Sequence, residues 1–271
     1  MSAVPASSPA PGLLAEAGWA LRDCALVTGR NLRHFVRQPQ LLIFSTIQPV
    51  MFVLLFSFVF GGAIGGTLPR GLDYVDFLLP GIFIQSSGFR ASQTAVGLAE
   101  DLQRGVVDRM RSMPMSRAAV LVGRTTADLV RSLFVVVLMI GVGYAVGFRF
   151  TEGVLEAAGA VAVVLLFGFA LSWIFTLVGL VTDSAEAAQS GGFVAIFPLV
   201  FVSSAFVPVE TMPAWLEGFA SASPVTAAVD SARALSLGGE VSDPLLLFLA
   251  WVAGLLAVFV PLSVWRYRRM A

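Results

Sequence analysis

Long apolar runs alternate with short polar stretches along most of this 271-residue chain. A helix that crosses the hydrocarbon core of a bilayer needs roughly 20 apolar residues, because that core is about 30 Å thick. Six runs come close to this length, and the pattern therefore predicts an all-α membrane protein with six transmembrane helices. The predicted spans are residues 41–60, 75–99, 129–147, 157–182, 191–207 and 244–265.

The positions of the arginines predict the orientation of these spans. All 17 basic residues are arginine, and basic residues are enriched on the cytoplasmic side of membrane proteins. With six spans, thirteen arginines fall on the side that holds both termini, and only Arg70, Arg149 and Arg233 fall on the other. We therefore expect a multi-pass protein of the cell (inner or plasma) membrane with both termini in the cytoplasm.

Composition narrows the chemistry that this chain can perform. It is 57% hydrophobic and 13% charged, whereas soluble domains carry roughly 25% charged residues. Without lysine there is no GKS or GKT phosphate-binding loop and no lysine Schiff base. With one histidine, His34, and one cysteine, Cys24, a His-rich metal site and an internal disulfide are excluded. The sequence therefore predicts no catalytic residues, no metal site and no cofactor in this chain.

The amino-terminal segment differs from the rest in its pattern. Residues 1–12 are rich in Ala, Pro and Ser and predict a disordered tail. Residues 13–38 predict an amphipathic helix whose apolar face is opposite Arg22, Arg30 and Arg33. Such a helix is typical of the cytoplasmic membrane interface; the alternative is a helix packed on the protein's own cytoplasmic surface. Residues 39–271 form the predicted six-span domain.

A charged insert separates the second and third predicted spans. Residues 100–131 hold six arginines and four acids. Leu102, Val106, Met110 and Met113 recur at helical spacing, so they predict an apolar stripe on a helix that Pro114 ends. The next helix should run from residue 117 to the end of the third span, which is longer than the bilayer requires. The insert therefore predicts a bent helical protrusion that docks a soluble partner; the alternative is a solvated connector.

Polar residues inside the predicted spans are candidates for a translocation pathway. A central arginine costs roughly 2.5–3.5 kcal/mol on insertion scales, so a charge within a span is by default a functional candidate. For Arg90 the alternative is that the second span ends near Phe89 and leaves the arginine at the cytoplasmic boundary. The candidates are Gln48 in the first span and Gln85, Ser86, Arg90 and Gln93 in the second.

Residues 208–243, between the fifth and sixth predicted spans, are too apolar for a simple external loop. Ser223, which is followed by a proline, predicts the start of a short helix, and a second short helix should precede it. Asp230 and Arg233 are spaced for an ion pair on the later helix, and Trp215 suits a membrane interface.

Three stretches resemble one known family. They are LPGIF at residues 79–83, RGVVDRMRSMPMSRAAVLVGR at residues 104–124 and MPAWLEGFASASPVTAAVDSARAL at residues 212–235. The chain resembles the permease subunit of type-2 ABC exporters, in the daunorubicin/doxorubicin-resistance branch. The resemblance implies a cytoplasmic coupling helix between spans two and three, and an external re-entrant helical hairpin between spans five and six. It also implies a second permease copy or a similar permease, and two ABC-type ATP-binding subunits that bind ATP and Mg.

The resemblance assigns contacts with the ATP-binding subunit to the first part of the charged insert, which we call the coupling segment. Its candidate residues are Leu102, Arg104, Val106, Asp108, Arg109, Met110, Arg111, Met113 and Pro114. The expected function is efflux of a hydrophobic or amphipathic compound, such as a drug, an antibiotic or a lipid, with no nucleic-acid partner. An autonomous channel or secondary carrier is the alternative, although it has no need of the charged protrusion. An intramembrane enzyme is disfavoured because His34 precedes the first span and HExxH is absent.

Overall fold

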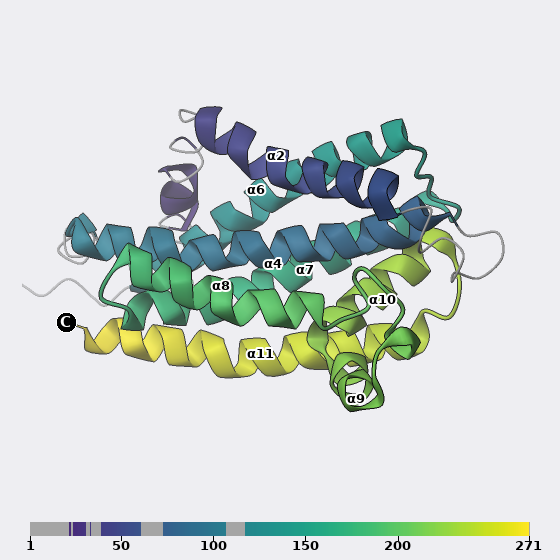
Figure 1. Ribbon diagram of the computed structural model, residues 1–271. Helices are drawn as coiled ribbons and strands as arrows, with labels where there is room; N and C mark the ends of the chain where they lie inside the picture. The colour runs from purple at the N-terminus through teal and green to yellow at the C-terminus, as the bar shows by residue number, and fades with distance from the viewer. Residues whose placement is uncertain are drawn as a thin grey trace, which may run out of the picture.

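The computed structural model describes residues 22, 24–30, 33, 39–60, 73–106 and 117–270, and within these ranges the chain forms helices and no strand. The long helices α2, α4, α6, α7, α8 and α11 run roughly along one direction, with α2 and α11 on opposite sides of α4 (Figure 1). The short helices α9 and α10 lie at the end of the bundle that is remote from the carboxyl terminus. The helices are α2 Pro39–Leu55, the π-helical turn η1 Phe56–Phe60, α4 Tyr74–Gln103, α6 Arg117–Val146, α7 Val154–Val181, α8 Ala185–Phe201, the 3-10 turn η3 Val209–Thr211, α9 Ala214–Ala222, α10 Pro224–Leu237 and α11 Ser242–Arg269.

Each predicted span corresponds to one long helix of the structure. Within the described residues, three of them contain apolar stretches long enough to cross a bilayer, and two shorter helical stretches are also apolar. The long stretches are Leu121–Val146, Val154–Val181 and Ser242–Arg269, and the shorter ones are Ile47–Val59 and Ala185–Phe201. Helix α4 is long enough, but it carries the polar residues noted above. The all-helical membrane architecture is therefore confirmed, and the number of six spans stays a prediction.

The fifth predicted span, residues 191–207, has the wrong boundaries. Helix α8 begins at Ala185 and ends at Phe201, so it starts six residues earlier than predicted and ends six residues earlier. Ser184 caps its start, because its Oγ accepts a hydrogen bond of 3.0 Å from the Ala187 amide. Hydropathy alone misplaces this helix, since its first turns are polar.

Helix α4 is the centre of the bundle and packs against α2, α6, α7, α8 and α10. Small residues permit the closest of these approaches. A Cβ atom at Gly179 of α7 would lie 2.7 Å from the carbonyl oxygen of Ala95 on α4, and a Cβ at Gly81 of α4 would collide with the carbonyl of Ala205. Side chains that are this small let membrane helices pack backbone to backbone.

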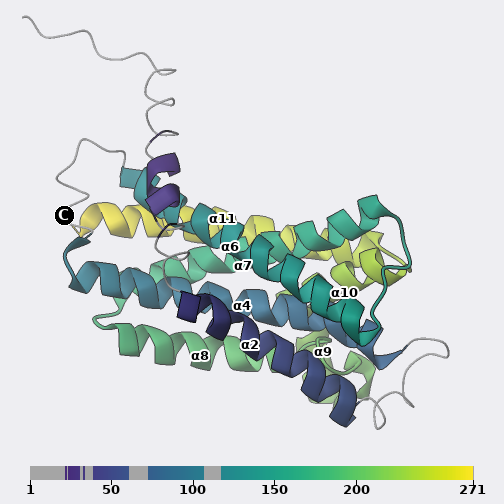
Figure 2. The ribbon, with the colours of Figure 1, turned by 90° about the horizontal axis from the view of Figure 1, so that it is seen from above.

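The described part of the amino-terminal segment is helical and packs on α6 (Figure 2). Val27 is buried, and the Thr28 hydroxyl donates a hydrogen bond of 3.0 Å to the carbonyl oxygen of Gly123. Ala25 and Leu26 are exposed on the other side of the turn. This turn therefore rests on the protein's own helix, as in the alternative interpretation, and it leaves a side exposed that can meet lipid. The predicted tail and most of the predicted amphipathic helix lie outside the described residues.

Candidate functional site

One cavity of about 860 Å³ lies among α2, α4, α6 and α8. Its size is within the usual range of small-molecule sites. All five candidate pathway residues line it. Gln48 reaches it from α2, and Gln85, Ser86, Arg90 and Gln93 reach it from α4. Gln189 of α8 also lines the cavity, and sequence reasoning missed it because the residue precedes the apolar run of its helix.

Part of the cavity wall is apolar. Phe52 of α2, Phe89 of α4 and Phe193 of α8 all line it. The ring centroids of Phe89 and Phe193 are 6.0 Å apart, within the range of an aromatic pair. The cavity therefore offers both hydrogen-bonding groups and aromatic surface, which suits an amphipathic molecule.

Polar contacts join the α4 wall of the cavity to the α6 wall. Thr94 donates a hydrogen bond of 2.7 Å to Asp128, whose other oxygen forms an ion pair of 2.7 Å with Arg131. Nearer the ends of the two helices, Arg124 pairs with Asp101 at 2.5 Å. These contacts fix the relative position of the two helices that the charged insert connects.

Sequence reasoning missed these cross-helix contacts, although a signal for them was present. Two antiparallel helices bring together residues that are equally distant from the connection between them. The pairs Asp101 with Arg124 and Thr94 with Asp128 are both centred within a few residues of Pro114, where the sequence predicted the bend. Matching each polar residue before the bend with the polar residue at a similar distance after it would have predicted both contacts.

Arg90 lies near the middle of α4, and its side chain is buried, with 8% of the residue exposed. Its Nη2 donates a hydrogen bond of 3.1 Å to the Ser87 hydroxyl, and its Nε lies 3.5 Å from the Ser132 hydroxyl of α6. Helix α4 continues to Gln103, so a span that ended near Phe89 would leave about four helical turns beyond it. In both interpretations of Arg90, the guanidinium faces the protein interior and not lipid.

The first residues of the coupling segment lie at the end of α4, beside the cavity. Arg104 forms an exposed ion pair of 3.3 Å with Glu100. Leu102 and Val106 pack on a cluster of the protein's own buried residues, which includes Leu121. Arg104 and Val106 also line the cavity.

The predicted apolar stripe does not lie on one unbroken helix. Helix α4 ends at Gln103, and Gly105 has a φ of +66°, a left-handed conformation that terminates helices. The Gly105 amide donates a hydrogen bond of 3.1 Å to the Leu102 carbonyl, which closes the last turn. The predicted stripe is therefore interrupted at residues 104 and 105, and Val106 is helical again. The remaining coupling candidates, Asp108, Arg109, Met110, Arg111, Met113 and Pro114, lie outside the described residues.

The segment between α8 and α11 contains two short helices, α9 and α10, as predicted; we call these two helices the hairpin. Ser223 caps α10, because its Oγ accepts a hydrogen bond of 3.2 Å from the Val225 amide, and Pro224 occupies the first helical position. Trp215 on α9 is 79% exposed. Asp230 and Arg233 form the predicted ion pair, with an N–O distance of 2.9 Å.

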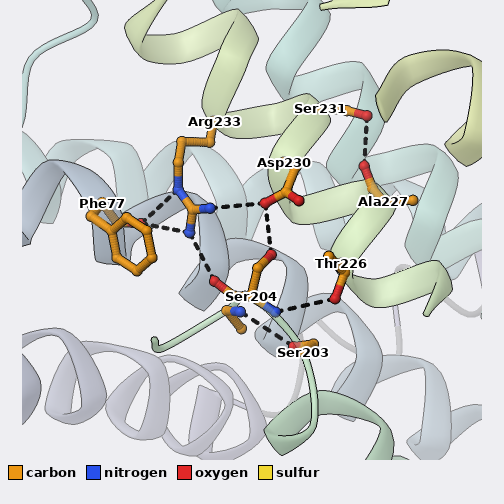
Figure 3. Close-up of polar contacts among 9 residues, drawn as sticks. Phe77, Ser203, Ser204, Thr226, Ala227, Asp230, Ser231 and Arg233 are labelled. Carbon is orange, nitrogen blue, oxygen red and sulfur yellow. Dashed lines mark hydrogen bonds and ion pairs between the residues drawn. The ribbon is translucent and has the colours of Figure 1, made fainter. Parts of the chain in front are cut away.

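Arg233 fastens the hairpin to the rest of the protein (Figure 3). Its guanidinium donates two hydrogen bonds, of 3.1 and 3.2 Å, to the Phe77 carbonyl and one of 2.9 Å to the Ser204 carbonyl. The same group lies 3.8 Å from the centroid of the Phe77 ring. Asp230 accepts a hydrogen bond of 2.7 Å from the Ser204 hydroxyl. Helix α10 is thereby tied to the start of α4 and to the turn after α8.

Burial shapes the electrostatics of this pair. It raises the pKa of the Asp230 carboxyl, while the Arg233 guanidinium and then the Ser204 hydroxyl act in the opposite direction. Burial also lowers the pKa of Arg233 to about 10, which still leaves the guanidinium charged at neutral pH. The ionised state of Asp230 therefore depends on Arg233. Elsewhere in the described ranges, no three His, Cys, Asp or Glu side chains converge to hold a metal ion.

The family model described as ABC-2 type transporter matches residues 22–237. The chain belongs to the ABC-2 type transporter family. It is 34% identical over 239 residues to the daunorubicin resistance ABC transporter permease protein DrrB1 of Streptomyces coeruleorubidus, which covers 88% of this chain and 83% of that protein. It is 29% identical over 262 residues to the probable doxorubicin resistance ABC transporter permease protein DrrC of Mycobacterium tuberculosis, covering 96% and 93%. The resemblance inferred from the three sequence stretches is confirmed.

More distant relatives also carry the description of a permease. The putative transport permease ycf38 of Pyropia yezoensis is 29% identical over 219 residues, covering 78% of this chain and 72% of that protein. The first two relatives are thus described as permease proteins of ABC transporters, and the third as a transport permease.

Proposed function

We propose that this ABC-2 family permease is the membrane subunit of an efflux transporter for hydrophobic or amphipathic compounds, and that a separate ATP-binding subunit drives it. One observation carries the proposal. Arg104 and Val106, at the start of the coupling segment, line the same cavity as Gln48 and Gln93, the candidate pathway residues. A partner that moves the coupling segment would therefore act directly on the wall of the candidate pathway.

The contacts between α4 and α6 support a mechanical link of this kind. The coupling segment connects the two helices, and the ion pair between Asp101 and Arg124 joins them close to that connection. A rigid pair of helices transmits a displacement at one end along its length, because packed elements move as units. Binding of ATP by two partner subunits would thus reorient the cavity from the cytoplasmic side to the outer side. The substrate would be an amphipathic molecule such as a drug, an antibiotic or a lipid.

The distribution of charge over the folded chain supports the proposed orientation. Leu102, Leu121 and Tyr267 belong to one cluster, which places the end of α4, the start of α6 and the end of α11 together. This end of the bundle also carries Arg104 and Arg124, as well as the arginines of the last turn of α11. We therefore place it in the cytoplasm, with both termini, and place the hairpin outside. Six spans, a paired permease subunit and two ATP-binding subunits complete the proposal.

Transport in reconstituted liposomes tests this function and separates it from its alternative. The permease should move a hydrophobic substrate only when the ATP-binding subunit that co-purifies with it is present and supplied with ATP. Permease alone and permease with the subunit and a non-hydrolysable nucleotide are the matched controls. Equal transport by permease alone would favour an autonomous channel or carrier and would contradict the proposal.

A further inference from the structure

The described wall of the cavity carries more positive than negative charge. Three carboxylates line it, and each one has an arginine partner: Glu100 pairs with Arg104, Asp101 with Arg124 and Asp128 with Arg131. Two further arginines, Arg30 and Arg90, also line the cavity. The described side chains around the cavity therefore leave two guanidinium charges without a matching carboxylate.

Of these two, Arg90 is the one that is buried. Its hydrogen-bond acceptors are the hydroxyls of Ser87 and Ser132, which are neutral and cannot balance its charge. Its Nη1 contacts no acceptor among the residues that the structure describes. Gln85 lines the same cavity, and its buried Nε2 is also without an acceptor in that part of the chain. Buried charges are normally paired, so the unbalanced charge of Arg90 at the cavity wall favours a ligand that carries an anion.

Part of the cavity wall is aromatic, and this indicates what kind of molecule would carry the anion. Phe52, Phe89 and Phe193 offer aromatic surface to the cavity. We propose that the cavity binds amphiphiles with an anionic head group, a carboxylate or a phosphate, with Arg90 as the counter-ion and the aromatic residues against the apolar body. Guanidinium groups suit both anions, because their planar N–H groups match carboxylate and phosphate oxygens. The inference rests on the proposed function, in which this molecule is the exported substrate.

A binding experiment with three amphiphiles that share one hydrocarbon chain tests the inference. Oleate, oleylamine and oleyl alcohol carry an anionic, a cationic and a neutral head group. Binding of each radiolabelled compound is measured to the purified full-length chain in nanodiscs of zwitterionic lipid, and binding to empty nanodiscs is subtracted. We expect oleate to bind roughly tenfold or more tightly than either of the others, as a charge-assisted contact would give. Equal affinities, or a preference for oleylamine, would overturn the inference.

Variants then assign the preference to the cavity. Arg90→Gln should weaken oleate binding roughly tenfold and leave oleyl alcohol binding unchanged, and Arg90→Lys should restore part of the loss. Arg268→Gln removes the same charge from an exposed position at the end of α11 and should change nothing. Undiminished oleate binding by Arg90→Gln would contradict the proposal.

A second variant keeps the test decisive if Arg90→Gln does not fold. Gln93 is exposed and lines the cavity, so Gln93→Trp fills the space without altering charge. It should weaken the binding of all three amphiphiles, and normal binding would place the site elsewhere. Phosphatidylglycerol added to the nanodiscs distinguishes two sources of the anion: competition with oleate assigns the site to a membrane lipid, and lack of competition assigns it to a separate amphiphile. Because neither ATP nor the ATP-binding subunit is present, the result is independent of the transport assay.

Discussion

Thr94 on α4 donates a hydrogen bond of 2.7 Å to Asp128 on α6, and Asp128 holds Arg131 through its other oxygen. The two helices that the coupling segment connects are thus joined by a partly buried polar contact in the wall of the candidate pathway. The Asp128 carboxylate thus accepts hydrogen bonds from both the Thr94 hydroxyl and the Arg131 guanidinium. Its loss should therefore disturb the packing of α4 on α6 more than the loss of either partner.

Replacing Asp128 tests this relationship. Asp128→Ala removes the hydrogen bond from Thr94 and leaves Arg131 without its carboxylate, so we expect a loss of roughly 1–3 kcal/mol in the free energy of unfolding. Thr94→Val removes only one hydrogen bond and should cost about 0.6 kcal/mol, a typical value for membrane helices. Denaturant titration of the detergent-solubilised protein measures both. A larger loss for Thr94→Val than for Asp128→Ala would contradict the account.

Close packing of α4 against α7 gives a second prediction. Gly179→Ala places a methyl group 2.7 Å from the Ala95 carbonyl oxygen, so the helices must separate, at a cost of roughly 1–3 kcal/mol. Gly141 on α6 is the matched control, because a Cβ there meets no atom within 4 Å. Gly141→Ala should be neutral or slightly stabilising, since alanine favours helix. Thermal unfolding of the two variants compares their stabilities directly. Equal stability would show that the close approach of α4 and α7 at Gly179 does not contribute to the stability of the fold.

The hairpin should loosen when Arg233 is replaced. Arg233→Gln removes three hydrogen bonds to the carbonyls of Phe77 and Ser204 and the ion pair with Asp230. We expect faster amide hydrogen exchange in α10 than in wild type and unchanged exchange in the interior of α7. Arg149→Gln is a control on the same end of the bundle, because the Arg149 guanidinium donates hydrogen bonds to the carbonyls of Tyr144 and Phe148 and, among the described residues, none to α10. Normal exchange in α10 of Arg233→Gln would show that other contacts hold the hairpin.

The same variant should acquire a distinct pH dependence. Burial raises the pKa of Asp230 and Arg233 opposes that rise, so Arg233→Gln should raise the folded-state pKa further. A carboxyl whose pKa is higher in the folded state than in the unfolded state stabilises the fold when protonated, and this stabilisation is lost as the pH rises through the folded-state pKa. The stability difference between Arg233→Gln and wild type should therefore be smaller at pH 5 than at pH 8. A difference that is constant across this range would contradict the role given to Arg233.

The coupling segment gives a prediction that depends on the sequence alone. Arg109→Glu or Met110→Glu should abolish most ATP-dependent export while leaving membrane insertion normal, because each change disrupts the surface that we propose to contact the ATP-binding subunit. Arg268→Gln, at the end of α11, is again the control for a change of charge. Export in proteoliposomes and co-purification of the ATP-binding subunit measure the two effects. Normal export by both coupling variants would remove these residues from the interface.

Hydrophobic periodicity predicts most of the helices because each long helix buries or exposes a continuous apolar surface. It fails where capping and backbone conformation decide the boundary. Helix α8 begins at a serine cap ahead of its apolar run, and α4 ends at Gln103, before the left-handed Gly105, although the apolar spacing continues to Val106. Both signals are single residues, and a pattern averaged over several turns does not resolve them.

The candidate pathway shows a different limit of sequence reasoning. Polar residues in apolar spans are conspicuous in the sequence, and all five candidates line the cavity. Their convergence depends on the packing of α2 and α8 against α4, which brings Gln48 and Gln189 into the lining of the same cavity as Gln93. No spacing along the chain encodes that arrangement, because the three helices are far apart in sequence. The imbalance of charge around Arg90 likewise becomes evident only after each carboxylate has been matched with its partner.

The link between the coupling segment and the cavity is tested most directly by the accessibility of position 93. In a Cys24→Ser background, Gln93→Cys places the only cysteine on the cavity wall. In the proposed orientation, a charged maleimide should reach this cysteine from the cytoplasmic side, which is the outer face of inside-out vesicles. With the ATP-binding subunit present, ATP should slow labelling several-fold, because the cavity turns away from the cytoplasm. Met110→Glu should abolish this protection by ATP and should leave the labelling rate without ATP unchanged. An unchanged labelling rate on addition of ATP, in a complex that hydrolyses ATP, would contradict the account.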